Sequence, residues 1–219
     1  MAPRVYIQEV AVRDGFQIEP VFVPTAMKIA LIDMLSGTGL AKIEVTAFVS
    51  PKAVPNLRDA EEVMRGIRRV PGVIYSALAP NVKGAERALE GLADEVNLVM
   101  SASETHNRAN VNRTTEQSLA GFHDVMRVVQ GSEVAVNGSI STSFGCPFEG
   151  AVPAERVLRL VERYLELGMD GVTLADTTGM AHPRQVQDLT HAVLARFPGT
   201  ELTLHFHNTR GMGLANVVA

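Results

Sequence analysis

The sequence has few cysteines, few aromatic residues and little net charge, and each shortage excludes a class of protein. Its 219 residues include one cysteine, Cys146, so no disulfide can form within the chain, as is usual in a reducing compartment. Tryptophan is absent, and eight phenylalanines and three tyrosines form no stacking platform for nucleic-acid bases. The net charge is −4 and Lys and Arg form no run, so we expect no nucleic-acid partner.

Long hydrophobic runs are absent as well. Every apolar run is far shorter than the ~20 residues that cross a membrane, and strand-like sequence begins near the amino terminus without a signal or transit segment. With 46% hydrophobic and 20% charged residues, the segment 1–219 is long enough for a single domain with a buried core. We therefore predict a cytoplasmic protein without a membrane partner.

Strand-like and helix-like segments alternate along the whole chain. Strands are expected at residues 5–12, 42–48, 73–79, 95–101, 133–141, 171–175 and 200–207. Helices are expected at residues 24–36, 59–69, 83–92, 115–130, 153–167 and 183–197, with one more beginning near Gly213 and a polar loop after residue 101. Such alternation is typical of a parallel sheet covered by helices.

The fold class follows from this number of strands. No G-x-G-x-x-G motif follows the first strand and no G-x-x-x-x-G-K-[ST] motif occurs, which disfavours a dinucleotide-binding or P-loop sheet. A TIM-type (β/α)8 barrel explains the pattern better, with about seven of its eight strands present. The expected architecture is an α/β barrel that lacks strand 8 and the carboxyl-terminal helices.

Two histidines, His205 and His207, lie one residue apart in the last predicted strand. Side chains alternate along a strand, so both imidazoles should point the same way. Such a pair favours a metal site, although two polar residues on a solvated face are the alternative. Asp14 follows the first predicted strand, in Arg13-Asp14-Gly15. A barrel would bring the ends of these two strands close together, so we expect the three residues to share an ion.

Other polar residues are expected at the carboxyl ends of strands, where active sites of such barrels lie. They include Arg13, Glu44, Asn137 and Asp176. Glu44 interrupts an apolar strand, and a buried carboxylate is costly without a partner such as Arg13. Purely structural roles are the open alternatives: Arg13 and Asp14 could form an exposed ion pair in a turn, and Asp176 could cap the next turn. For Cys146, packing or turn chemistry is favoured over a nucleophilic role.

Five short segments occur in an order that resembles one known family. They are Arg13-Asp14-Gly15-Phe16-Gln17, Phe48-Val49-Ser50-Pro51-Lys52-Ala53-Val54-Pro55, Gly145-Cys146-Pro147-Phe148-Glu149-Gly150, Asp176-Thr177-Thr178-Gly179 and His205-Phe206-His207-Asn208. Together they resemble the 3-hydroxy-3-methylglutaryl-CoA (HMG-CoA) lyase family of metal-dependent barrel enzymes, from about Val5 to Ala219. The second and third segments point to the lyase branch rather than to isopropylmalate or homocitrate synthases.

The resemblance implies a retro-Claisen cleavage of an acyl-CoA substrate, HMG-CoA, to acetyl-CoA and acetoacetate, as in leucine catabolism and ketone body metabolism. It implies a divalent cation, Mg or Mn with Zn as the alternative, held by Asp14, His205 and His207. Arg13 would face the thioester carbonyl, and the other catalytic residues would be Glu44, Asp176 and His205. The implied substrate-binding residues are Gln17, Ser50, Lys52, Asn137 and Ser141.

The sequence also departs from the family pattern. The family's strand 8, with a G-G-C-P loop and an asparagine ligand, has no counterpart here, which we interpret as a fragment or a truncated product. Asn137-Gly138-Ser139 replaces an Arg-Gly-Tyr-like segment, and Val12 stands where Pro is usual. Two alternatives therefore stay open: an inactive remnant that binds metal or acyl-CoA, and a lyase or synthase for a related 3-hydroxyacyl-CoA. A homo-oligomer is also left open.

Overall fold

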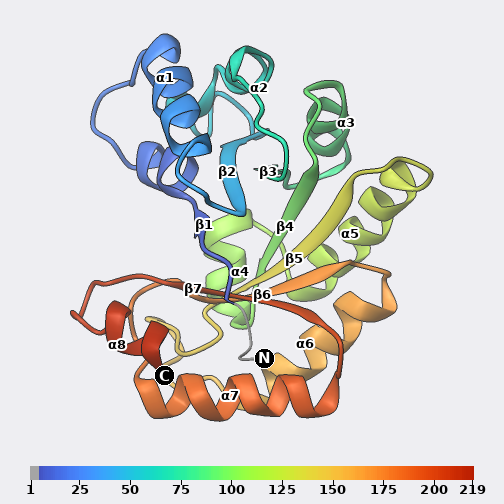
Figure 1. Cartoon of the computed structure of the whole chain (residues 1–219). Helices are drawn as coiled ribbons and strands as arrows, with labels where there is room; N and C mark the ends of the chain where they lie inside the picture. The colour runs from blue at the N-terminus through green and yellow to red at the C-terminus, as the bar shows by residue number, and fades with distance from the viewer. Residues whose placement is uncertain (1–4) are drawn as a thin grey trace. The chain divides into compact units, whose positions relative to one another are not determined.

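The computed structural model describes residues 5–219, and within them seven strands form a sheet in the order β1-β2-β3-β4-β5-β6-β7 (Figure 1). The strand order equals the chain order, and the strand pairs within each unit are parallel. The chain divides into two compact units: residues up to 97 with 127–135 form unit 1, and residues 98–126 with 136–219 form unit 2. The predicted α/β class with parallel strands is confirmed.

Unit 1 is built around the buried strand β2. Its elements are β1 (Gln8–Glu9), the π-helix η1 (Ala11–Gly15), α1 (Thr25–Ser36), β2 (Lys42–Ala47), the 3-10 helix η2 (Pro55–Leu57), α2 (Ala60–Gly66), β3 (Ile74–Leu78), α3 (Val82–Glu90) and the first residues of β4 (Glu95–Ser101). Helices α1 and α2 pack against each other and against β2 (Figure 1).

The residues of β2 alternate between apolar and polar, yet all six are buried. Alternate side chains of a strand point to opposite faces, so one face of β2 is polar. Its two charged groups are paired inside unit 1: Lys42 Nζ donates to Glu95 Oε2 at 2.5 Å, and Glu44 Oε2 accepts from Asn97 Nδ2 at 3.0 Å. The charge of Lys42 is therefore compensated by Glu95, and the carboxylate of Glu44 is hydrogen-bonded by Asn97.

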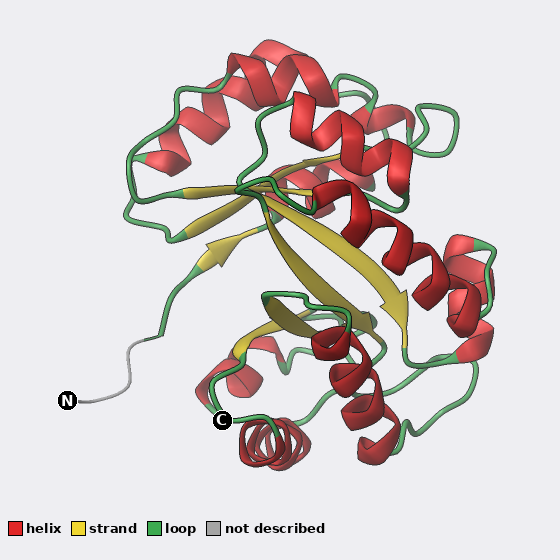
Figure 2. Cartoon of the chain, turned by 90° about the vertical axis from the view of Figure 1, so that its right-hand side faces the viewer, coloured by secondary structure: helices red, strands yellow, loops and turns green. Residues whose placement is uncertain are grey.

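Unit 2 is built around the pair β6 and β7, which is in register over six residues. Its elements are the end of β4, α4 (Glu104–Val111), most of α5 (Thr115–Val129), most of β5 (Ala135–Ser141), α6 (Ala154–Glu166), β6 (Gly171–Asp176), α7 (Pro183–Arg196), β7 (Glu201–Phe206) and α8 (Gly213–Val218). Helix α6 packs on β6 and on α7, and α8 contacts α7 and β7; Figure 2 colours these helices red and strands yellow. In residues 5–219, no helix combines the length and apolar character needed to cross a membrane.

The first predicted strand, residues 5–12, is wrong in its extent. Only Gln8–Glu9 pair with β2. The Glu9 carboxylate then accepts hydrogen bonds from the backbone N–H groups of Val10 and Ala11, at 2.8 Å each. These amides are satisfied locally, so the chain leaves the sheet and turns into η1.

The polar loop predicted after residue 101 is also wrong, because it contains helix α4. The Ser103 hydroxyl caps this helix by accepting from the N–H of His106 at 3.1 Å, and Asn112 ends it with a positive φ of 53°. Serine before a helix and asparagine after it are ordinary start and stop signals. The helix was missed because its residues show no apolar periodicity.

Strand β5 lies very close to the buried end of α6 at Gly138. A Cβ atom there would lie 2.2 Å from Cδ2 of Tyr164 and 2.6 Å from Sδ of Met169. Tyr164 is fully buried; its hydroxyl donates to the carbonyl of Ser139 at 3.2 Å, and burial raises its pKa well above the ordinary value. Only a glycine fits between β5 and this ring.

We predict that Gly138→Ala destabilises the protein by about 1–3 kcal/mol, the usual cost of overpacking a filled core. Urea unfolding followed by circular dichroism measures the change. Ser139→Ala, one residue along β5 on the opposite strand face, is the control and should cost less than half as much. Equal stability of Gly138→Ala and the unmodified protein would show that α6 can move away from β5 without cost.

Candidate metal and substrate site

Arg13 and Asp14 lie in η1, directly after β1, and form an ion cluster with Glu44 of β2. Arg13 Nε donates to Glu44 Oε1, and Arg13 Nη1 donates to Asp14 Oδ1 at 2.7 Å. The side chain of Arg13 is 13% exposed and that of Glu44 is 11% exposed. The ion pair considered as an alternative for Arg13 and Asp14 is present, but it is half-buried, with side chains 13% and 26% exposed. A π-helix is rare and often occurs at functional sites.

The charge of Arg13 is fixed by these neighbours. Burial disfavours the guanidinium cation, but the carboxylates of Glu44 and Asp14 favour it more strongly, and the pKa of Arg13 is raised above its ordinary value. A cation held between two carboxylates in a largely dry environment can stabilise an oxyanion that forms beside it.

Asn97 is a further member of this cluster that the sequence did not reveal. It lies on β4 and is 7% exposed, and its amide donates to Glu44 Oε2 at 3.0 Å. Both oxygens of Glu44 are thus engaged, one by Arg13 and one by Asn97, which fixes the orientation of the carboxylate. The available signal was a polar residue inside the apolar strand 95–101, the same signal that singled out Glu44.

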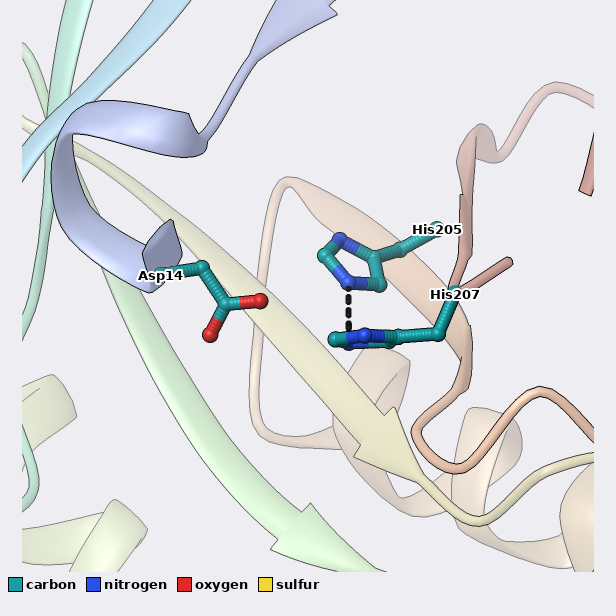
Figure 3. A group of neighbouring side chains, drawn as sticks. All are labelled: Asp14, His205 and His207. Carbon is teal, nitrogen blue, oxygen red and sulfur yellow. Dashed lines mark hydrogen bonds between the residues drawn. The ribbon is translucent and has the colours of Figure 1, made fainter. Parts of the chain in front are cut away.

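In unit 2, His205 and His207 face each other (Figure 3). His205 lies on β7 and His207 directly follows that strand. Their Nε2 atoms are 3.0 Å apart and their ring centroids 4.9 Å apart. The predicted common orientation of the two imidazoles is confirmed. In this hydrogen bond one Nε2 carries the hydrogen and the other offers its lone pair.

Asp176, the last residue of β6, is 1% exposed. Its Oδ1 accepts from the N–H of Met180 at 2.7 Å, so it does cap the following turn, as the alternative predicted. Its Oδ2 is buried and, among the described residues, has no hydrogen-bond partner. Since a buried carboxylate oxygen without a partner is costly, this atom is available to a ligand or a proton. The backbone carbonyl of Asp176 accepts from the N–H of His207 at 3.4 Å.

The residues predicted to bind substrate fall in both units. In unit 1, Gln17 is half-buried just after η1, while Ser50 and Lys52 are exposed in a turn after β2 where the N–H of Lys52 donates to Ser50 Oγ at 3.3 Å. In unit 2, Asn137 and Ser141 are both buried on β5, each 7% exposed.

The prediction that Glu44 and Asn137 lie at strand ends is wrong. Each is the third residue of its strand, because β2 continues to Ala47 and β5 to Ser141. The amide of Asn137 donates to Thr173 Oγ1 of β6 at 2.9 Å, an uncharged pair that the sequence did not reveal.

Cys146 is buried and takes part in turn chemistry, in agreement with the prediction. Its Sγ donates to Ser103 Oγ at 3.0 Å and accepts from the N–H groups of Phe148 and Glu149 at 3.3 and 3.4 Å. The thiol thereby connects the loop 143–150 to the amino end of α4.

Glu149 makes a second connection between the same loop and helix α4. Its carboxylate accepts from the N–H of Thr105 at 2.8 Å and from Arg156 Nη1 at 2.9 Å. The amide of Thr105 is the largest of the effects that lower the pKa of Glu149 to about 2, and Ser103 and Arg156 add to it. The carboxylate stays ionised and bound at any physiological pH.

The fold and the site together define a class of α/β protein of TIM type, with a buried arginine–carboxylate cluster and a histidine pair. The chain belongs to the HMGL-like family, whose pattern matches residues 4–219. It is 50% identical to hydroxymethylglutaryl-CoA lyase YngG of Bacillus subtilis over 98% of this chain and 72% of that protein. It is 42% identical to the mitochondrial hydroxymethylglutaryl-CoA lyase of Rattus norvegicus, and there it spans 98% of this chain and 66% of the relative.

Solved structures agree with this assignment and confirm the TIM-type fold. The Bacillus subtilis HMG-CoA lyase matches with a TM-score of 0.95 at 50% identity, over 98% of this chain and 72% of that one. An HMG-CoA lyase from Acinetobacter baumannii, in complex with coenzyme A and 3-methylmalate, matches with a TM-score of 0.94 at 55% identity, over 97% and 70% of the two chains. The carboxyl transferase domain of Rhizobium etli pyruvate carboxylase, at 17% identity and a TM-score of 0.72, shares only the fold.

We predict that the Glu149 contacts stabilise the protein at neutral pH and lose this effect in acid. The folded-state pKa of about 2 lies below the ordinary value of 4.5, so the contribution is present above pH 4.5 and disappears as the pH falls toward 2. Urea unfolding of the unmodified protein and of Glu149→Gln should show a difference at pH 7 that shrinks steadily below pH 4.5. A difference that does not depend on pH would contradict the assigned ionisation.

Proposed function

We propose that this chain carries the activity of an HMG-CoA lyase and cleaves 3-hydroxy-3-methylglutaryl-CoA to acetyl-CoA and acetoacetate. The observation that carries the proposal is 50% identity to the Bacillus subtilis hydroxymethylglutaryl-CoA lyase over 98% of this chain. The chain spans 72% of that enzyme and 66% of the rat enzyme, so the activity of the whole enzyme is a proposal for this chain. The same proposal treats residues 1–219 as one catalytic domain.

The proposal includes a divalent cation held by Asp14, His205 and His207. One carboxylate and two imidazoles, each offering one ligand atom, are a suitable donor set for Mg or Mn, with Zn as the alternative. The facing Nε2 atoms of the histidines fit such an ion, since a cation between them would take both lone pairs and replace the shared hydrogen. When bound, the ion would supply Lewis-acid chemistry that lowers the pKa of the substrate hydroxyl.

Arg13 is proposed to stabilise the negative charge that forms on the thioester oxygen. Cleavage of the carbon–carbon bond leaves its electron pair on the acetyl-CoA carbon, and the resulting enolate places charge on that oxygen. Glu44 and Asn97 hold the guanidinium in one orientation, so its donors need no rearrangement during the reaction. Glu44 is thus a positioning carboxylate in this scheme.

Asp176 is proposed to accept the hydroxyl proton of the substrate. Its Oδ2 atom is buried and has no hydrogen-bond partner among the described residues, whereas Oδ1 is held by the turn amide of Met180. A carboxylate with one oxygen fixed and the other available is well prepared to receive a proton. His205 of the neighbouring strand β7, which pairs with Ala175, is the second residue that could carry it.

Gln17, Ser50, Lys52, Asn137 and Ser141 are proposed to contact the acyl-CoA. A related 3-hydroxyacyl-CoA is the second candidate substrate. Asn137 and Thr173 form a neutral pair, whereas a substrate with a charged acyl end would favour a cation at this position. Three predictions from the sequence stay predictions: that the chain is an inactive remnant, that it forms a homo-oligomer and that it is located in the cytoplasm.

We predict that His207→Ala removes metal binding and lowers turnover by at least ~100-fold, because even residues outside the metal's own ligands typically cost 10- to 100-fold. Calorimetric titration with MnCl2 and an acetoacetate assay measure both effects. His191→Ala, an exposed histidine on α7, is the control and should change neither. Undiminished turnover of His207→Ala after treatment with a chelator would exclude the metal scheme.

We predict that Arg13→Gln lowers kcat by about 100- to 1,000-fold, the usual loss when an oxyanion-stabilising donor is removed. Metal affinity should change much less, because Arg13 acts on the developing enolate. Steady-state kinetics and MnCl2 titration of the same preparation separate the two effects. A variant that keeps its kcat but no longer binds metal would reverse the roles assigned to Arg13.

A further inference from the structure

Lys28 and Asp59 form a buried ion pair in unit 1 that the proposed reaction does not use. Lys28 Nζ lies 2.7 Å from Asp59 Oδ1, and the two side chains are 3% and 6% exposed. Nζ also lies 4.4 Å from the centroid of the Phe22 ring. Burying two charges is expensive, so a pair of this kind is retained where the positions of its partners matter.

The carboxylate of Asp59 does not cap helix α2, although its position suggests that role. Asp59 is the N-cap residue of α2, where an aspartate usually accepts hydrogen bonds from the first amides of the helix, but it makes no such bond. Instead, Oδ1 accepts from Lys28 and Oδ2 accepts from the hydroxyl of Thr25 at 2.8 Å. The start of α2 is thereby bound to the start of α1.

Lys28, besides pairing with Asp59, contacts Asn56, which lies in η2. Its Nζ donates to the backbone carbonyl of Asn56 at 2.6 Å. The side-chain amide of Asn56 then donates to the carbonyls of Gln17 and Glu19, at 3.4 and 2.6 Å. One amide thus joins the segment that follows η1 to the loop that follows β2.

Both joined segments carry residues proposed to contact the acyl-CoA. The N–H of Ile18 donates to the carbonyl of Gly15 at 3.2 Å, which closes a turn around Gln17. The carbonyl of Ser50 accepts from the N–H of Val54 at 3.0 Å, which closes a second turn just before η2. Each turn is held internally, so Asn56 sets the position of one turn relative to the other.

We infer that Asn56 is a positioning residue for acyl-CoA, held in place by the Lys28–Asp59 pair. This inference rests on the proposed function, because it takes Gln17, Ser50 and Lys52 as the substrate contacts. It assigns Asn56 no contact with the substrate. Its amide keeps the two turns at the spacing in which their residues bind one ligand, which lowers the conformational cost of binding.

The test is Asn56→Ala, measured by steady-state cleavage of HMG-CoA and by calorimetric binding of acetyl-CoA. We expect KM, and the Kd of acetyl-CoA, to rise by about 2- to 10-fold, the ratio that one neutral hydrogen bond represents. The kcat value and the affinity for MnCl2 should stay unchanged, because weaker ground-state binding affects KM alone. Asn56→Asp should bind more weakly still, since its carboxylate would face the carbonyls of Gln17 and Glu19.

Asp94→Ala is the matched control. Asp94 also joins two segments, accepting from the N–H of Tyr75 at 2.8 Å and pairing with Arg69 at 2.6 Å, but it precedes β4 at the amino end of the strand. It should lower the melting temperature and leave KM unchanged. If Asn56→Ala leaves both KM and the Kd of acetyl-CoA at the unmodified values, or raises them no more than Asp94→Ala does, the inference is wrong.

The same measurements separate this inference from the proposed function. If the unmodified protein binds acetyl-CoA but produces no acetoacetate, the lyase assignment fails and the ratio of Kd values still decides the role of Asn56. If the unmodified protein neither binds acetyl-CoA nor produces acetoacetate, both ideas are overturned.

Discussion

The interaction on which the candidate site depends is the cluster that Arg13 forms with Glu44 and Asp14 inside unit 1. A guanidinium and a carboxylate are each unfavourable in a largely dry environment, and each becomes acceptable only with the other in place. Asn97 completes the arrangement by occupying the second oxygen of Glu44. The cation is thereby kept charged and in one orientation, which is what stabilising an enolate requires.

Unit 2 supplies a different kind of chemistry. The facing nitrogens of His205 and His207 and the buried, unpartnered Oδ2 of Asp176 are groups that accept a cation or a proton. They come from two neighbouring parallel strands, in which Ala175 pairs with His205. Parallel pairing therefore places chemically reactive side chains from segments about 30 residues apart at the carboxyl ends of neighbouring strands.

Polar residues inside apolar strands were the most productive signal in the sequence. Glu44 and the two histidines were identified because a charged or polar group in a buried strand needs a reason. The same signal was present at Asn97 and at Thr173, but their partners, Glu44 and Asn137, lie 53 and 36 residues away, so only the folded chain reveals them. The first strand was predicted too long because the Glu9 carboxylate, which accepts from backbone N–H groups, overrides its apolar pattern. Helix α4 was missed because it has no apolar periodicity and its start depends on the hydroxyl of Ser103, which accepts from the N–H of His106.

The sequence by itself determined the α/β class, the order of strands and helices and the family, because these follow from periodicity and from motifs that are local in the chain. It also determined the common orientation of His205 and His207, which strand geometry requires. Only the tertiary structure decided that Glu44 is bound by both Arg13 and Asn97, and that Asn56 joins the turns around Gln17 and Ser50. These contacts join residues 31 to 53 positions apart, which no local pattern relates to one another, so only folding brings them together.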